Sequence, residues 1–187
     1  WNVARSNLTN RQTIGRAGRN ARTHYDIGND LYVRMLGEEM IYSCARWDGA
    51  EDLDTAQEIK LELICKKLHL EPGMRVLDIG SGWGGFARHA AVNHGATVVG
   101  ISPAGEQVRE ARRRAGSLPI EFHQQDYREA TGTYDRIVSI GMMEHVGPRN
   151  YQGFFDRCRD LLTPDGLMPM PPLRQKPIQY FSLISMS

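Results

Sequence analysis

The chain has 187 residues, of which 41% are hydrophobic and 24% charged, and this suits one soluble globular domain with a buried core. Its net charge of +1 gives no overall argument for nucleic-acid binding, so no nucleic-acid partner is expected. No apolar run approaches the roughly 20 residues of a membrane-spanning helix, and no signal peptide is visible.

The basic residues gather at the start of the chain. Residues 1–23 are expected to form a basic N-terminal arm, and residues 1–25 contain no acidic residue. Their arginines are Arg5, Arg11, Arg16, Arg19 and Arg22. Two interpretations remain open: a solvated, partly disordered arm, or a segment that contacts an anionic surface such as phospholipid headgroups.

Residues 24–70 are expected to form a helical lid or cap region. Asp30 can cap a short helix, and residues 54–69 have the periodicity of an amphipathic helix. Between them, residues 41–47 form a loop dense in aromatic and hydroxyl groups. Such a loop suits either the lining of a site or a hydrophobic lid over the core.

Residues 75–85 predict a strand, a glycine loop and the start of a helix. Asp78 lies at the end of the strand, in the pattern D-x-G-x-G-x-G. A loop of this kind leaves backbone N–H groups pointing into a cleft, where a charged ligand meets no Cβ. A dinucleotide-binding loop usually carries its acidic residue about 20 positions later, which argues against that class.

Three further strands are predicted at residues 96–101, 119–123 and 134–140, with helices at residues 106–115 and 150–162. Strand and helix alternate, which predicts an α/β fold with a doubly wound, mainly parallel sheet. In such sheets ligands bind at the carboxyl ends of the strands.

The last segment, residues 167–187, is an atypical Pro-rich tail. Proline donates no ladder hydrogen bond, and four prolines among residues 169–177 argue against a fifth central strand. We therefore expect a sheet that is incomplete after the fourth strand and its helix, in a chain truncated or altered after Gly166. The chain also begins with Trp1 rather than Met, which favours a missing upstream piece.

The cysteines and histidines predict neither disulfides nor a metal. Cys44, Cys65 and Cys158 are too few and too widely spaced for a disulfide framework, and they suit a reducing cytoplasm. The six histidines show no H-x-x-x-H spacing and no cysteine pair accompanies them, so no metal site is expected.

Several motifs occur in one order along the chain, at residues 24–30, 42–45, 78–85, 125–128 and 141–147. Together they resemble the cyclopropane-fatty-acyl-phospholipid synthase family, which includes the mycolic acid cyclopropane synthases. The resemblance runs from about residue 24 to residue 166. It implies a Rossmann-like methyltransferase fold, with residues 71–166 as the core that binds S-adenosylmethionine.

The resemblance also implies where the cofactor is held. The methionine end is expected near Gly80 and Gly82, the ribose end near a neutral stretch that closes the second strand, and the adenine beside residues after the third strand. The full expected set is Tyr25, Tyr42, Ser43, Asp78, Gly80, Gly82, Ser102, Gln107, Asp126, Tyr127 and Ile140. For Asp126 the alternative is a capping residue of the next helix.

In the family, the alkene of an unsaturated acyl chain attacks the sulfonium methyl, and a base then removes a proton as the ring closes. The resulting cation must be shielded from water and needs a base close by. The resemblance implies a bicarbonate ion as that base, with Cys44 and Glu144 as catalytic ligands and with Ile140 and Gly141 as wall and backbone. The alternatives are packing for Cys44 and solvent exposure for Glu144. His145 is treated as structural, since a sequence neighbour of Glu144 points elsewhere.

The implied function is transfer of a methylene group to the cis double bond of a phospholipid acyl chain, forming a cyclopropane fatty acid. Two alternatives stay open: a non-catalytic remnant that binds cofactor or membrane, and a methyltransferase for another small acceptor. The family's His-Thr dipeptide after the fifth strand, and a tyrosine further on, have no counterpart here, which argues against full cyclopropane synthesis by this chain. The expected location is cytoplasmic and peripheral to an anionic membrane surface, with a homodimer also considered.

Overall fold

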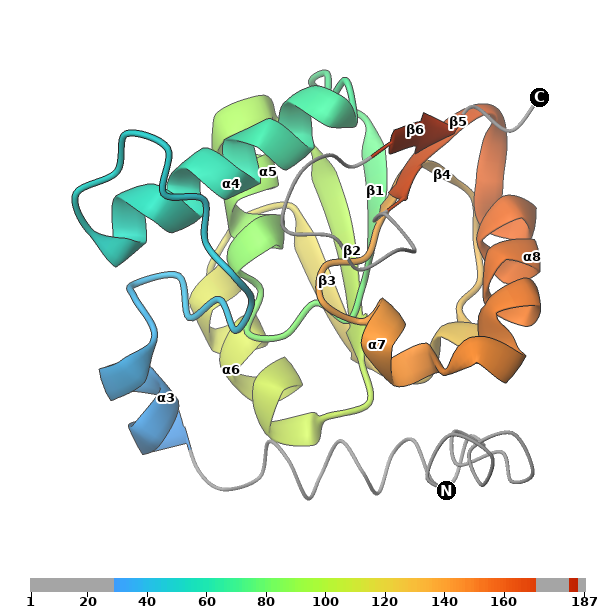
Figure 1. Ribbon diagram of the computed structural model, residues 1–187. Helices are drawn as coiled ribbons and strands as arrows, with labels where there is room; N and C mark the ends of the chain where they lie inside the picture. Colours follow the sequence, from blue (N-terminus) through green and yellow to red (C-terminus); the bar gives the residue numbers. More distant parts are fainter. Residues whose placement is uncertain (1–28, 171–181, 185–187) are drawn as a thin grey trace, which may run out of the picture.

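A six-stranded sheet runs through the computed structural model, which describes residues 29–170 and 182–184 (Figure 1). The strand order is β3-β2-β1-β4-β5-β6; the first five are mutually parallel, and β6 is antiparallel to β5. The strands are β1 (Arg75–Ile79), β2 (Thr97–Ser102), β3 (Ile120–Gln124), β4 (Tyr134–Val138), β5 (Leu162–Met170) and β6 (Ser182–Ile184).

Helices cover both faces of this sheet (Figure 1). The described helices are α3 (Asn29–Met35), α4 (Leu53–Lys67), α5 (Gly85–His94), α6 (Gly105–Ala115), α7 (Met143–Val146) and α8 (Tyr151–Leu161), with 3₁₀ turns η1 (Tyr127–Glu129) and η2 (Pro148–Asn150). None of them is long and apolar enough to cross a bilayer.

Two core layers follow from the alternation of side chains along each strand. On β1, Val76 faces α4, α5 and α6, and packs with Leu61, Phe86 and their neighbours. Leu77, the next residue, faces α7 and α8, where Phe154 is fully buried. Because both faces are covered, the central strands β1 and β2 are buried at all but their first residue, as is typical of parallel sheets, while the edge strand β3 is mostly exposed.

The predicted α/β fold with a doubly wound, mainly parallel sheet is confirmed. The order of the described strands reverses between β1 and β4, because β2 and β3 extend to one side of β1 while β4 and β5 extend to the other. This arrangement opens a crevice at the carboxyl ends of β1 and β4, where ligands bind in folds of this type.

The expected end of the sheet after its fourth strand is wrong. Residues 162–170 form β5, which pairs with β4 through Tyr134–Leu162 and Arg136–Leu167. The register shifts between these two pairs, and Pro164 lies in the shifted segment, where it interrupts no ladder bond. Pro169 lies beyond the pairing with β4, in the stretch that pairs with β6.

A third, smaller cluster attaches α3 to the glycine loop. Trp83, only 1% exposed, packs with Tyr32 and Met40, and its indole N–H donates to the side-chain oxygen of Asn29 at 2.9 Å. Asp30 lies inside the first turn of α3 rather than at its cap. Residues 1–28, 171–181 and 185–187, and with them all of the predicted basic arm and most of the Pro-rich tail, lie outside the described residues, so the four-part division of the chain stays a prediction.

Candidate cofactor site

A cavity of about 500 Å³ opens at the carboxyl ends of β1, β2 and β4. Its volume lies within the range of small-molecule sites, about 300–1,000 Å³. The lining comes from the loop after β1, the ends of β2 and β4, the segment before η1 and residues 40–43. All the loops that the sequence singled out therefore meet at one edge of the sheet.

The structure brings together every described residue of the expected cofactor set. Those that line the cavity are Tyr42, Ser43, Asp78, Gly80, Gly82, Ser102, Gln107, Asp126, Tyr127 and Ile140. Tyr25 lies outside the described residues. Cys44 is exposed and does not line the cavity, although its neighbour Ser43 does. Glu144 belongs to α7, next to the lining residue His145, but its side chain is not described.

The glycine loop turns back on the sheet before it reaches the cavity. The amide N–H groups of Gly80 and Ser81 both donate to the carbonyl oxygen of Ile101, at 2.9 and 3.1 Å. Gly80 therefore serves the tight turn, with φ at 83°, and not as a backbone donor to a ligand. Gly82, with φ at 54°, has nothing within 4 Å of the position a Cβ would take, so the space beside it is open.

Two buried side-chain oxygens, one at the end of β1 and one in the loop after it, have no hydrogen-bond partner among the described residues. They are the Oδ2 atom of Asp78 and the Oγ atom of Ser81, and both residues line the cavity. Asp78 is 2% exposed, and burial raises the pKa of its carboxyl to about 7. An unpaired buried polar group typically costs about 1–3 kcal/mol, so this end of the cavity suits a ligand that donates hydrogen bonds or carries positive charge.

The end of β2 is polar but uncharged. The hydroxyl of Ser102 donates to Gln107 Oε1 at 3.1 Å and accepts from the amide of Ala104 at 3.2 Å. Ser102 and Gln107 are 3% and 5% exposed, so they form a fixed polar wall that can meet hydroxyl groups.

Asp126 performs the capping role that the sequence left open as an alternative. Its Oδ1 accepts from the Arg128 amide at 3.0 Å and from Arg128 Nε at 2.6 Å, while its Oδ2 accepts from Arg128 Nη2 at 2.7 Å. Its side chain also accepts from the backbone N–H of Glu129 in a capping box, so its roughly four acceptor sites are filled within the protein. Tyr127 packs edge-on against Phe154, with ring centroids 5.0 Å apart, and forms part of the wall.

Helix α4 fixes the loop of residues 40–43 from outside the cavity. The side-chain amide of Gln57 donates to the carbonyl oxygens of Ile41 and Ser43, at 3.3 and 3.0 Å. The ammonium of Lys60 donates to Ser43 Oγ at 2.8 Å. Lys60 is 8% exposed, and burial lowers the pKa of its amine to about 8.

Sequence reasoning did not identify Gln57 and Lys60 as residues of the site. The available signal was their position: both are polar, they are three residues apart, and they fall on the face of α4 that also buries Leu61 and Ile64. Long polar side chains at such a position need partners, and here the partners are the site loop.

The side of the cavity next to α7 is largely apolar. Ile140, Met142 and Val146 line it, together with Leu61 and Phe86 from the opposite layer. His145, treated as structural from the sequence, also lines the cavity and is exposed. The cavity therefore combines a polar end at β1 and β2 with an apolar wall at β4 and α7.

This combination agrees with comparisons to known proteins. The family model described as mycolic acid cyclopropane synthetase matches residues 12–177. The chain belongs to this family. It is 48% identical over 165 residues to a cyclopropane-fatty-acyl-phospholipid synthase of Escherichia coli K12, covering 88% of this chain and 43% of that protein. It is 41% identical over 157 residues to sphingolipid C9-methyltransferase B of Emericella nidulans, covering 79% of this chain and 31% of that protein.

Solved structures support the same assignment. The mycolic acid cyclopropane synthase CmaA1, in a complex with SAH and CTAB, superposes with a TM-score of 0.78 at 32% identity, covering 81% of this chain and 55% of that one. The family resemblance expected from the motifs is thus confirmed. This chain spans less than half the length of the two curated relatives described above.

Proposed function

We propose that this chain is the S-adenosylmethionine-binding core of an enzyme that transfers a methylene group to the cis double bond of a phospholipid acyl chain, forming a cyclopropane fatty acid. The observation that carries the proposal is the cavity in which the unpaired carboxylate of Asp78 faces the same space as an apolar wall. The relatedness to a cyclopropane-fatty-acyl-phospholipid synthase gives the proposed substrate class.

The residues present fit the cofactor. Asp78 and Ser81 offer unpaired buried acceptors to an amino group, and the open space at Gly82 admits a ligand close to the backbone. Ser102 and Gln107 would meet the ribose hydroxyls, and Asp126, which lines the cavity, would accept from an adenine amino group in place of one of its bonds from Arg128. When bound, the cofactor supplies an electrophilic methyl group on a sulfonium.

The apolar wall has two roles in the proposed reaction. Ile140, Met142 and Val146 give an acyl chain a surface on which to lie, and they exclude water from the positive charge that develops on the alkene carbon. Hydration of that carbon would trap it as an alcohol, so the ring closes only where water is absent. A base must then take one proton from the transferred carbon.

We propose bicarbonate as that base, with Cys44 and Glu144 as its catalytic ligands. The support from this chain is electrostatic: the buried ammonium of Lys60 lies 2.8 Å from Ser43 Oγ, directly before Cys44 in sequence, and its positive charge favours an anion there. Since the thiol of Cys44 is exposed, its role requires the loop at Ser43 to turn it inward.

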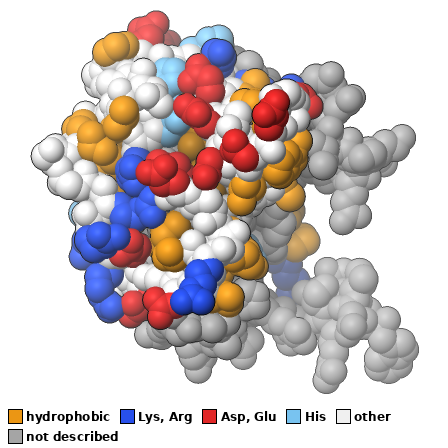
Figure 2. Space-filling view, turned by 90° about the vertical axis from the view of Figure 1, so that its left-hand side faces the viewer, with side chains coloured by type: hydrophobic (Ala, Val, Ile, Leu, Met, Phe, Trp, Pro, Cys, Tyr) orange, Lys and Arg blue, Asp and Glu red, His pale blue; other side chains and the backbone are white. Residues whose placement is uncertain are grey.

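The proposal extends to the parts of the chain around the core. Residues 24–70 would act as a lid, because α4 holds the site loop through Gln57 and Lys60. Peripheral contact with an anionic membrane, in the cytoplasm, would bring the acyl chain to the cavity. Figure 2 views the side where α3 lies, and there hydrophobic side chains lie among basic and acidic ones. A homodimer stays a prediction.

The deciding experiment incubates the protein with S-adenosylmethionine and vesicles of unsaturated phospholipid. Mass spectrometry should find acyl chains heavier by one CH₂, and calorimetry should find cofactor binding. Binding without product would support the non-catalytic alternative. Product on a soluble acceptor but not on vesicles would support a methyltransferase for another small acceptor. Absence of binding would remove the cofactor assignment itself.

Glu144→Gln tests the proposed base site. The variant should keep cofactor affinity, because the glutamine is nearly isosteric, and should lose about 100-fold or more in turnover, because the bicarbonate would lose a charged ligand. Calorimetry and product analysis separate the two effects. Full turnover by this variant would show that Glu144 is not a catalytic residue.

A further inference from the structure

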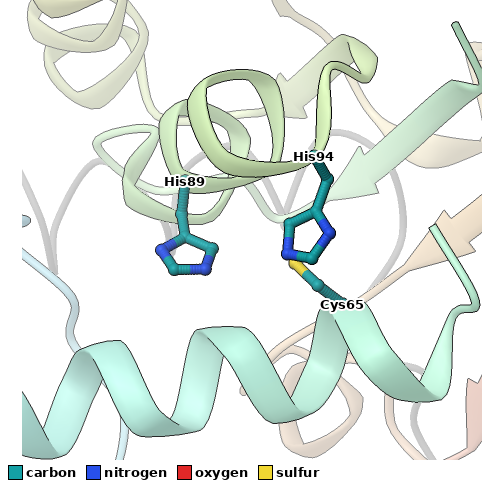
Figure 3. Close-up of side chains that lie close together, drawn as sticks. All are labelled: Cys65, His89 and His94. Atoms are coloured by element: carbon teal, nitrogen blue, oxygen red, sulfur yellow. The ribbon is translucent and has the colours of Figure 1, made fainter. Parts of the chain in front are cut away.

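Three side chains with metal-binding atoms meet between α4 and α5, away from the cofactor cavity (Figure 3). The imidazoles of His89 and His94 point from α5 toward α4, and the thiol of Cys65 points from α4 toward the His94 ring. One ligand atom from each residue lies within 4.8 Å of the other two. None of the three residues lines the cofactor cavity.

A fourth donor reaches the same place. Glu62 precedes Cys65 by three residues, so both side chains lie on one face of α4. Its Oε2 atom lies 2.9 Å from His94 Nε2 and 3.4 Å from His89 Nε2. The Glu62 carboxylate therefore borders the two imidazoles of the cluster formed by Cys65, His89 and His94.

We propose that Glu62, Cys65, His89 and His94 form a zinc-binding site that joins α4 to α5. Thiolate, imidazole and carboxylate are the ligands that zinc takes in proteins, usually four in a tetrahedron. Bond lengths of about 2.0–2.3 Å place tetrahedral ligand atoms about 3.3–3.8 Å apart. The ligand atoms of Cys65, His89 and His94 lie within 4.8 Å of one another, which exceeds that spacing by up to about 1.5 Å, and side-chain rotations that also bring in Glu62 can close the gap.

Burial and neighbouring contacts suit such an ion. Cys65 is fully buried, the side chains of His89 and His94 are 8% and 17% exposed, and that of Glu62 is 35% exposed, so the ion would approach from the glutamate side. Asn93 lies one turn beyond His89, and its side-chain amide is 3.1 Å from His89 Nδ1. If His89 bound zinc through Nε2, its Nδ1–H would donate to the Asn93 oxygen after an amide flip, and this contact would orient the ring.

The site would position α4 with respect to the core. The same helix carries Gln57 and Lys60, which hold the loop of residues 40–43 at the cofactor cavity. Zinc would therefore brace the outer wall of the cavity without taking part in its chemistry. The sequence did not indicate this site, because its ligands are split between two helices at spacings of three and five residues.

A simpler arrangement is a hydrogen-bonded group of Glu62 with the two histidines. It differs in one testable respect, since Cys65 would have no part in any metal binding. The experiment treats the whole chain with a chelator, removes the chelator, and titrates with Zn²⁺ by calorimetry and with Co²⁺ by absorption spectroscopy. We expect one Zn²⁺ per chain, a higher melting temperature with Zn²⁺, and a thiolate-to-cobalt charge-transfer band.

Matched variants locate the ion. Cys65→Ala and His94→Gln should each weaken Zn²⁺ binding by about tenfold or more, and Cys65→Ala should remove the charge-transfer band. Cys158→Ala changes another buried thiol, and His123→Gln another histidine beside a glutamate, 3.3 Å from Glu121. Both controls should bind Zn²⁺ like the wild type.

The proposal fails if the chain binds no stoichiometric Zn²⁺, if the cobalt complex lacks the band, or if His94→Gln binds as tightly as wild type. His94 is partly exposed, so its variant decides the matter even where Cys65→Ala does not fold. Loss of binding in His123→Gln would place the ion elsewhere and overturn the assignment as well.

Discussion

Asp78 combines deep burial with a carboxylate oxygen that no described residue pairs. Burial raises the pKa of its carboxyl to about 7 in the folded chain, from an ordinary value of 3.8. The folded state therefore holds a proton that the unfolded state releases between these two values. Its stabilising contribution is complete below pH of about 3.8 and is lost as the pH rises to about 7.

Asp78→Asn should remove this pH dependence. The ligand-free variant should melt at a higher temperature than wild type at pH 8, and the difference should shrink toward pH 4, because asparagine has no charge to bury. Its affinity for S-adenosylmethionine should fall by about tenfold or more, since a charged hydrogen-bond partner is worth about 1.5–3 kcal/mol. Melting curves at several pH values measure the stability difference, and calorimetry measures the affinity for S-adenosylmethionine. An unchanged affinity would show that Asp78 does not meet the cofactor.

Lys60 has the opposite charge and a comparable burial. Its pKa is lowered to about 8 by burial, so below that pH the folded chain holds a buried ammonium that donates to the Ser43 hydroxyl. Below pH 8, Lys60→Met should be at least as stable as wild type, because methionine has no charge to bury. Any gain in stability over wild type should diminish as the pH rises from about 8 toward 10.5, the pKa of the lysine in the unfolded chain.

The effect of Lys60→Met on function should be more severe. Turnover should fall by about tenfold or more while cofactor affinity changes little, because the variant removes the positive charge beside Cys44 and the bond that holds Ser43. Lys66→Met is the control: this lysine lies on the same helix, and its side chain is 70% exposed. Addition of bicarbonate should partly restore turnover in Lys60→Met if the lysine favours that anion. An equal loss of turnover in Lys66→Met would show that any charge removed from α4 has this effect, and would refute a specific role of Lys60.

At the scale of elements, the glycine loop has a test in Gly82→Val. A valine at a positive φ strains the backbone by about 1–2 kcal/mol and also places two methyl groups in the open space of the cavity. Gly49→Val is the matched control, because Gly49 has φ at 80°, open space around its Cβ position, and no place in the cavity. Both variants should lose similar stability in melting experiments, but only Gly82→Val should lose measurable cofactor binding. Equal binding by the two would refute the loop's role.

The elements that the sequence predicted are those with a strong local signal. Strands β1 and β2 are largely apolar runs close to glycine or proline, and the helix after the loop ends at Gly95, which has the expected left-handed conformation. Strand β5 was missed because proline was read as excluding a strand. Proline excludes a strand only where the missing N–H would join the ladder, and the register shift that spares Pro164 arises from pairing with β4.

The site was predictable at the strand ends and less so in the loops. Residues that follow β1, β2 and β4 meet because parallel strands end at one edge, so Asp78, Ser102 and Ile140 share a cavity. Side-chain direction in the loop of residues 40–44 depends on contacts from α4, which the sequence does not reveal. For that reason Ser43 faces the cavity while Cys44, its neighbour, is exposed.

At the scale of the whole molecule, the proposed substrate must leave a bilayer to reach the cavity, so the protein needs a surface that binds lipid. The described residues offer one on α3, where Leu31 and Met35, one turn apart on the same face, are 53% and 47% exposed. Trp83 ties this helix to the glycine loop through Asn29, so lipid bound at α3 would lie beside the cofactor site. Isolated exposed apolar residues are common, but a group on one short helix marks an interaction surface.

Leu31→Glu should therefore weaken binding to vesicles of unsaturated anionic phospholipid, because a charge replaces apolar area on that surface. Cosedimentation measures the loss, and product formation on the same vesicles should fall with it, while cofactor affinity in solution stays as in wild type. Val92→Glu is the control, since Val92 is 64% exposed on α5, at a distance in sequence and on another helix. If both variants bind vesicles equally well, α3 is not the membrane contact. If Leu31→Glu binds vesicles normally but forms no product, α3 acts instead on the path of the acyl chain into the cavity.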